Sequence, residues 1–219
     1  MKTILIYSGG LDSTVLLYKL LGEGQDVTAL HFNYGQLHGQ AEEACAVWHT
    51  AMREVELKYI RLPFIETDFR SALLEGKEDI PDGHYADESM KATVVPFRNG
   101  VMLSIAAGYA ESVKAQTIAI ANHAGDHPIY PDCRTKFIKD MNEAIMEGTD
   151  GLVGIASPFC NMNKADIVRL GHELKVPFEN TWSCYKGGDL HCGKCGTCVE
   201  RIEAFKLTGI TDDTRYMEN

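Results

Sequence analysis

A short apolar strand, a glycine turn and a helix follow one another at the start of this chain, and this unit limits the folds that it can adopt. Residues 2–7 (KTILIY) are apolar and β-branched and end at Ser-Gly-Gly, which predicts a buried strand. Leucines at helical spacing predict a helix over 13–21. The same patterns predict strands over 27–32 and 57–62 with a helix over 40–55 between them. This βαβαβ order is typical of a parallel sheet with right-handed crossovers.

The strand and helix patterns continue to alternate, so the predicted fold class is α/β with a doubly wound, mainly parallel sheet. Further helices are expected over 100–113, 135–146 and 164–174, and a further strand over 117–121. The polar segment 75–91 suits a surface loop or lid. Beyond Pro177, Gly and Cys replace the apolar periodicity. We therefore predict an α/β domain over 1–175 and a small module over 176–219 packed on it.

Composition and charge exclude several classes of protein. A hydrophobic content of 45% and a charged content of 24% in 219 residues favour a compact unit over a disordered chain. No apolar run approaches the roughly 18 to 20 residues of a membrane helix, so we expect a cytoplasmic protein with no membrane partner. Lys plus Arg is 21 against Asp plus Glu at 31, and the formal charge of −10 repels a polyphosphate backbone. We therefore expect no nucleic-acid partner.

The glycine turn SGGLDS at residues 8–13 lies where a helix begins, so free backbone N–H groups and the helix dipole can bind an anion there. Two glycines let the backbone approach phosphate oxygens, and the hydroxyls of Ser8, Ser13 and Thr14 can donate to them. The Gly-Lys-Ser/Thr ending of a Walker loop is absent, which argues against ordinary γ-phosphate transfer. Asp12 would repel a bare triphosphate, and we interpret it as acting through bound Mg²⁺. Ser-Gly-Gly alone would also suit an ordinary capped turn.

Four of the seven cysteines crowd into one short segment: Cys184, Cys192, Cys195 and Cys198. Glycines between them let a short backbone wrap around one ion, and tetrahedral zinc fits this ligand set best. Four thiolates leave no position for water, so such a site would be structural. An iron–sulfur cluster also takes four cysteines, and His191 could replace one thiolate. A redox dithiol at Cys192 and Cys195 is less favoured because it would leave two cysteines without a role.

Five motifs taken together resemble one known family. They are SGGLDS, Tyr34-Gly35-Gln36, Pro96-Phe97-Arg98-Asn99, Tyr130-Pro131-Asp132-Cys133-Arg134, and Thr181-Trp182-Ser183-Cys184-Tyr185 before CGKCGTC. SGGLDS after the first strand resembles the PP-loop of the ATP pyrophosphatase superfamily, whose fold is adenine nucleotide alpha hydrolase-like. The whole set, from about Ile4 to Phe205, resembles the QueC family of 7-cyano-7-deazaguanine synthases.

The resemblance implies an ATP-dependent C–N ligase in queuosine precursor biosynthesis. Such enzymes convert 7-carboxy-7-deazaguanine and ammonia into 7-cyano-7-deazaguanine. ATP adenylates the carboxylate, ammonia displaces AMP to give the amide, and a second activation dehydrates the amide to the nitrile. The family suggests a homodimer, while structural Zn²⁺ at the four cysteines and ATP with Mg²⁺ as co-substrate are expected from the residues themselves.

Residue roles follow from the matched positions. The ATP pocket is expected along the loop and the next helix, at Ser8, Gly9, Gly10, Leu11, Asp12, Ser13, Thr14, Val15, Leu16, Leu17 and Tyr18. The expected catalytic residues are Asp12, Ser13, Arg98 and Lys164. Arg98 and Lys164 stand at predicted helix starts with fixed positive charge, although an exposed surface cation is the alternative for each. The expected substrate contacts are Phe97, Tyr130, Asp132 and Arg134. Asp132 could accept hydrogen bonds from a guanine-like base, and Tyr130 or Phe97 could stack on it.

Two positions depart from the family pattern. Residues 126–129 read Asp-His-Pro-Ile where the family usually has Asp-Tyr-Ser-Gly, and Leu37 stands where a basic residue often follows Tyr-Gly-Gln.

Two other functions stay open. A PP-loop tRNA thiolation enzyme would need an RNA-binding extension and a basic face, and a non-enzymatic ATP-binding sensor with a zinc-stabilised interaction module would release no AMP. Trp48 and Trp182 are expected in the core, and Cys133 as a buried apolar side chain.

Overall fold

The computed structural model describes residues 1–74, 76 and 79–218. Five parallel strands form one sheet in the order β3-β2-β1-β4-β5. The strands are β1 Lys2–Ile6, β2 Asp26–Asn33, β3 Glu56–Arg61, β4 Thr117–Ala119 and β5 Gly154–Ala156. The helices are α1 Leu11–Gly22, α2 Gly39–Met52, α3 Pro63–Asp68, α4 Arg98–Ser112, α5 Thr135–Gly148, α6 Lys164–Glu173 and α7 Gly196–Thr208. Short 3-10 turns cover Glu88–Thr93, Ala124–Asp126, Pro131–Cys133 and Phe178–Asn180. The predicted doubly wound α/β sheet is confirmed.

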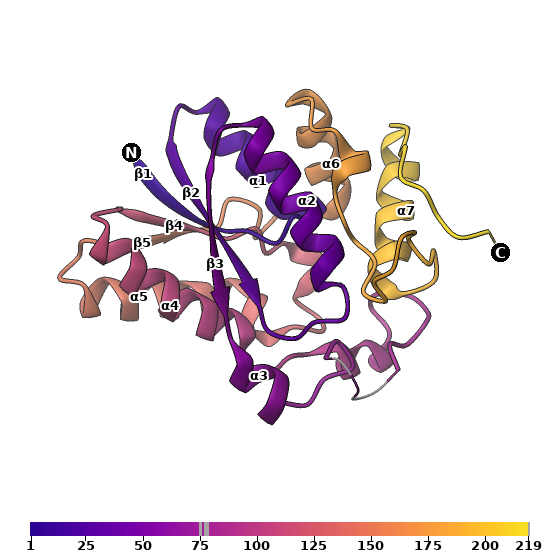
Figure 1. The fold of residues 1–219 in the computed structure, drawn as a ribbon, viewed down its shortest axis with the longest axis horizontal. Helices are drawn as coiled ribbons and strands as arrows, with labels where there is room; N and C mark the ends of the chain where they lie inside the picture. Colours follow the sequence, from indigo (N-terminus) through magenta and orange to yellow (C-terminus); the bar gives the residue numbers. More distant parts are fainter. Residues whose placement is uncertain (75, 77–78, 219) are drawn as a thin grey trace.

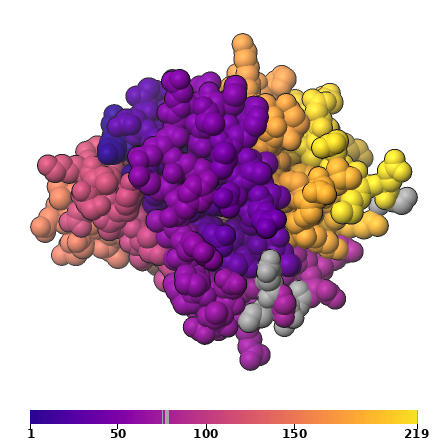
Figure 2. Space-filling view, in the orientation of Figure 1, coloured from indigo at the N-terminus to yellow at the C-terminus, as the bar shows by residue number. Residues whose placement is uncertain are grey.

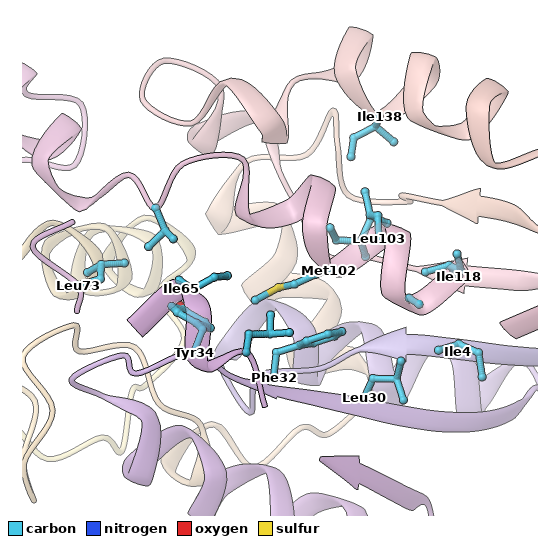
Figure 3. Close-up of a cluster of buried hydrophobic side chains, with 14 of the residues drawn as sticks. Ile4, Leu30, Phe32, Tyr34, Ile65, Leu73, Met102, Leu103, Ile118 and Ile138 are labelled. Carbon is cyan, nitrogen blue, oxygen red and sulfur yellow. The ribbon is translucent and has the colours of Figure 1, made fainter. Parts of the chain in front are cut away.

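Helices cover both faces of the sheet (Figure 1). Along β1, Ile4 faces the layer of α4 and α5, whereas Leu5 faces the layer of α1 and α6, because successive strand residues point to opposite faces. Figure 3 shows the buried apolar cluster on the Ile4 face of the sheet, where Leu30 and Phe32 of β2 lie opposite Met102 on α4. Each fully buried side chain of this kind stabilises the fold by about 1.5–3 kcal/mol.

The C-terminal segment packs directly against the rest of the chain (Figure 2). Ala204 and Phe205 of α7 belong to the same buried cluster as α1 and α6. The Arg201 guanidinium, which is 1% exposed, donates to both carboxylate oxygens of Asp212 at 2.9 and 3.0 Å. These contacts tie the last residues to α7, while the division into units at 1–175 and 176–219 stays a prediction.

Several boundaries differ from those predicted. The helix expected over 40–55 ends at Met52, because Glu54 adopts a left-handed φ of 54° that an α-helix cannot continue. The strand expected over 117–121 stops at Ala119, and β5 and α3 carried no pattern strong enough to predict. Trp48 was expected in the core and is 38% exposed, so that prediction is wrong.

The predicted loop over 75–91 falls partly outside the described residues, since residues 75, 77 and 78 are among those not described. Further along this segment, Asp82 forms a β-bridge with Cys195, and the Gly83 N–H donates to the Lys194 carbonyl at 3.0 Å. The later part of the loop therefore lies on the cysteine segment. Among the described residues, no helix has the length and apolar character of a membrane span.

Candidate active site

A cavity of about 220 Å³ lies at the carboxyl ends of β1 and β4. Residues that follow β1, such as Ser8 and Gly10, line it together with Ala121 and Asn122, which follow β4. The chain winds outward from β1 through β2 to β3 on one side and from β4 to β5 on the other. Ligands in open α/β sheets bind at this kind of switch point, so the topology itself places the site here.

The phosphate loop, residues 8–13, holds itself in shape by local hydrogen bonds. The Gly10 N–H donates to Ser8 Oγ at 3.0 Å, and Ser13 Oγ lies 3.1 Å from Ser8 Oγ. No side chain caps the start of α1 at Gly10. Because the first N–H groups of a helix have no partner within it, this end of α1 presents donors suited to phosphate oxygens.

Gly9 brings the loop into direct contact with α2. It has φ +88°, and a Cβ added there would lie 2.3 Å from the Glu42 carbonyl oxygen and 2.7 Å from the Ala46 nitrogen. Both distances are far inside normal contact, so no side chain fits at this position. The loop conformation therefore depends on glycine here for two independent reasons.

A buried ion-pair cluster lies beside the phosphate loop. Lys164 Nζ is 2.6 Å from Asp12 Oδ2 and 3.3 Å from Glu200 Oε2, and the Lys164 side chain is only 13% exposed. Burial opposes ionisation of Asp12, but the charges of Lys164 and His123 hold its pKa below the usual value. Burial also opposes the charge on Lys164, but Asp12 and Glu200 raise its pKa overall. Both groups therefore stay charged at neutral pH.

The Asp12 carboxylate keeps one oxygen available for a cation. Asp12 Oδ1 is buried and has no hydrogen-bond partner within the described part of the chain. A buried carboxylate oxygen is costly to leave unpaired, and hard divalent cations prefer oxygen ligands. The residue thus fits the predicted role as a Mg²⁺ ligand for bound nucleotide.

The opposite side of the cavity combines one cation with aromatic rings. Arg98, the first residue of α4, donates from Nη1 to the Tyr34 hydroxyl at 2.7 Å. The hydroxyls of Tyr130 and Tyr185 lie 3.2 Å apart and line the same space. The apolar side chains of Phe32, Met102 and Ile120 complete it. A flat heterocycle with an anionic substituent would suit this side.

The four cysteine sulfurs meet in one buried cluster. The Sγ atoms of Cys184, Cys192, Cys195 and Cys198 all lie within 4.8 Å of one another. Backbone N–H groups of Cys192 and Cys195 point at neighbouring sulfurs at 3.4 and 3.3 Å. This arrangement fits a single ion held by four thiolates. His191 is engaged elsewhere, since its Nε2 accepts from the Ser183 N–H at 3.0 Å, so the sulfur cluster forms without it.

Comparison with known proteins decides the family. The family model of the queuosine biosynthesis protein QueC matches residues 2–209. The chain belongs to the QueC family. Among its relatives, the 7-cyano-7-deazaguanine synthase of Desulfotalea psychrophila is 50% identical over 215 residues, covering 98% of each chain. That of Porphyromonas gingivalis is 49% identical over 214 residues, covering 98% of this chain and 96% of the relative.

Solved structures support the fold of this QueC chain. The NMN synthetase of Francisella tularensis matches with a TM-score of 0.54 at 18% identity, covering 96% of this chain and 78% of that one. The U34-tRNA thiolase NcsA of Methanococcus maripaludis matches with a TM-score of 0.51 at 18% identity, covering 95% and 65%. At this identity the likeness shows the shared α/β fold alone. The family match and the relatives named 7-cyano-7-deazaguanine synthase, and not these fold matches, leave the tRNA thiolation and sensor alternatives not favoured.

The structure brings the predicted site residues of this QueC chain together only in part. Those that line the cavity are Ser8, Gly10, Leu11, Asp12, Ser13, Arg98, Tyr130 and Lys164. Those in the loop or α1 that do not line it are Gly9, Thr14, Val15, Leu16, Leu17 and Tyr18. These α1 side chains are buried in the core, and the Tyr18 hydroxyl lies 3.2 Å from His49 Nδ1. A helix turns most of its residues away from any one ligand, which explains the division.

Three predicted substrate contacts lie outside the cavity. Phe97 is 57% exposed and packs edge to face on Phe137. Asp132 is buried, and its Oδ2 accepts from the Asn99 N–H at 2.8 Å, so it satisfies a free donor at the start of α4. Arg134 donates from Nε to the His127 carbonyl at 3.0 Å. Their roles toward substrate stay predictions.

Sequence reasoning missed several cavity residues. Tyr34 and Tyr185 stand inside the family motifs but received no role. His38 and Glu42 belong to no motif but line the cavity, and Glu200, which pairs with the cavity residue Lys164, lies in the helix after the cysteines. The one signal available was proximity, since His38 and Glu42 lie two and six residues after Gln36, and Glu200 lies two residues after Cys198.

Proposed function

We propose that this QueC protein is an ATP-dependent 7-cyano-7-deazaguanine synthase that joins ammonia to 7-carboxy-7-deazaguanine. One observation carries the proposal: a single cavity connects the phosphate loop and Lys164 with Arg98 and an apolar, tyrosine-lined side. We propose that a nucleotide phosphate and the carboxylate of a flat base bind next to each other in this cavity. Full-length relatives with this name support the same reaction.

The chemistry needs an activated carboxylate, because a carboxylate is a poor electrophile whose oxygen leaves with difficulty. We propose that the loop N–H groups and the Ser8 and Ser13 hydroxyls hold the pyrophosphate end of ATP, while Lys164 neutralises the phosphates. Arg98 orients the substrate carboxylate toward the α-phosphate. Mg²⁺ bound at Asp12 would add positive charge on the departing pyrophosphate.

Positioning then supplies much of the acceleration. The cavity holds both reacting groups at fixed distance, and such an arrangement lowers the barrier by removing the entropy cost of their encounter. The apolar wall of Phe32, Met102 and Ile120 excludes water that would hydrolyse the acyl adenylate. Tyr130 also lines this wall, where its ring can stack on the base.

The test uses purified protein with Mg-ATP, ammonium and 7-carboxy-7-deazaguanine, followed by mass spectrometry. AMP and the nitrile are expected to appear together. AMP that appears only with tRNA and a sulfur donor would favour thiolation, and ATP binding without AMP under either condition would favour a sensor. A Glu43→Gln variant is the control for substitutions at the cavity, since Glu43 does not line it and this substitution should leave turnover unchanged.

Narrower parts of the proposal have their own measurements. We propose that the thiolate cluster holds one structural Zn²⁺, which elemental analysis distinguishes from iron and sulfide. We also propose a cytoplasmic homodimer without a nucleic-acid partner, which light scattering and a tRNA-binding assay would test. Four sulfurs within 4.8 Å of one another support the first part, and the charge of −10 supports the lack of nucleic acid.

A further inference from the structure

We propose that the Glu42 carboxylate accepts the proton that the incoming nitrogen loses when the amide forms, a role that rests on the proposed synthase function. Adenylation and ammonia transfer need different groups. The phosphate loop and Lys164 serve the first, and none of them can take up a proton from nitrogen. Glu42 lies in the same cavity and has no part in the nucleotide chemistry described above.

Glu42 stands on α2 where that helix packs on the phosphate loop. Its backbone carbonyl approaches Gly9, and its side chain, 14% exposed, reaches into the cavity. Gln36 Nε2 donates to Glu42 Oε2 at 3.5 Å, and His38 Nε2 lies 3.7 Å from the same oxygen. Arg98 from α4 lines the cavity as well. The carboxylate therefore shares one cavity with residues 8–13 and with the cation that would orient the substrate.

Most other ionisable groups of the cavity are unsuited to move a proton at neutral pH. Asp12 is paired with Lys164 at 2.6 Å. Asp126 Oδ2 accepts from the backbone N–H of His123 at 3.0 Å. Burial raises the pKa of Cys133 well above its ordinary value, and it does the same for Tyr185. Asp12, Cys133 and Tyr185 therefore each keep one protonation state through the reaction.

The surroundings of Glu42, by contrast, allow its carboxyl group to change protonation state near neutral pH. Burial raises the pKa of Glu42 to about 7, although the Arg98 charge and hydrogen bonds from Gln36 and Ser8 oppose the shift. Burial and Arg98 lower the pKa of neighbouring His38 to about 4, so the imidazole is neutral and does not compete for the proton. A group with a pKa near the working pH can accept and release a proton in each cycle.

The step balances without any further reactant. The ammonia nitrogen uses its lone pair to form the C–N bond to the acyl adenylate. The C–O bond to AMP breaks, and its electron pair leaves on the AMP phosphate oxygen. The nitrogen, now positively charged, transfers one proton to the Glu42 carboxylate, which later releases it to water. In the dehydration the same nitrogen must lose its two remaining protons as the nitrile forms, so one base at this position would serve both stages.

The experiment separates adenylation from amide formation in Glu42→Gln. Exchange of labelled pyrophosphate into ATP, measured with the acid and without ammonium, is expected to stay within about threefold of wild type, because it needs no proton acceptor. Amide formation is expected to fall by about 100-fold or more, the usual size of a general-base contribution. The acyl adenylate should accumulate, and the rise of kcat through about pH 7 should disappear. Glu42→Asp should recover part of the rate.

Three outcomes would overturn the assignment. Unchanged amide formation in Glu42→Gln would remove Glu42 from the chemistry. Equal loss of exchange and amide formation would give it a binding role instead. An unchanged pH profile with a reduced rate would make it structural. Failure of the proposed function looks different, because wild-type protein and the Glu43→Gln control would then show no acid-dependent exchange at all.

Discussion

Replacing Gly9 with alanine should disable the phosphate loop while leaving most of the fold in place. Gly9 has φ +88°, and the new Cβ would lie 2.3 Å from the Glu42 carbonyl oxygen. To reach ordinary contact the loop must move away from α2 by about 1 Å. A shift of about 1 Å in positioned groups costs on the order of 100-fold in rate. The left-handed backbone adds about 1–2 kcal/mol of destabilisation for alanine.

The assay compares Gly9→Ala with Gly24→Ala. Gly24 also has a positive φ, +72°, but a Cβ there meets no atom within 4 Å. Urea denaturation should therefore show the backbone cost of about 1–2 kcal/mol in both variants, with a larger loss in Gly9→Ala. AMP release should fall by about 100-fold only in Gly9→Ala. A folded Gly9→Ala protein with turnover equal to that of Gly24→Ala would refute the reasoning that loop position depends on this contact.

Asp12→Asn should suppress AMP release strongly with little change in the melting temperature, because Glu200 still pairs with Lys164 at 3.3 Å after the Asp12 charge is lost; loss of the fold would instead give Asp12 a structural role. Cys195→Ser should lower bound metal and melting temperature together, and unchanged values in metal analysis and calorimetry would remove it as a ligand. Glu42→Gln should match wild type in stability near pH 4 and exceed it by up to about 3 kcal/mol at pH 8. Because burial raises the pKa of Glu42 to about 7, the wild-type protein loses stability as the carboxyl ionises between about pH 4.5 and pH 7, and the amide does not ionise. Urea titrations at both pH values check this, and equal curves at pH 8 would contradict it. Arg201→Met should lower the free energy of unfolding by about 3–5 kcal/mol, because it leaves the Asp212 carboxylate without its partner, and a change below 1 kcal/mol would contradict that account.

The parts of the site that sequence could predict are those encoded in contiguous residues. The phosphate loop at 8–13 joins a strand to a helix, and its glycines and hydroxyls are enough to predict an anion site from the local sequence. The cysteine cluster is likewise set by spacing within one segment. Lys164 and Arg98 were predicted because a basic residue at a helix start is visible in sequence, and both line the cavity.

The remainder depends on which helix face meets which edge of the sheet. Glu42 reaches the cavity because α2 turns its Ala46 side toward the loop, and the same rotation leaves Trp48 exposed. No feature of the local sequence predicts that Glu42 faces the cavity and that Trp48 faces solvent. Asp132 shows a related limit, since the motif marks the residue as important but not that its carboxylate accepts from Asn99 at the start of α4.

Helix α7 connects the cysteine cluster with Lys164, the residue proposed to neutralise the nucleotide phosphates. It begins beside the cysteines, and less than one turn after Cys198 it presents Glu200 to Lys164 at 3.3 Å. Thr197, between two of the cysteines, lines the cavity itself. When the ion is lost, we expect the Glu200 carboxylate to move away from Lys164 before the sheet unfolds. With the ion proposed above, metal starvation would then show first as weaker ATP binding or slower turnover.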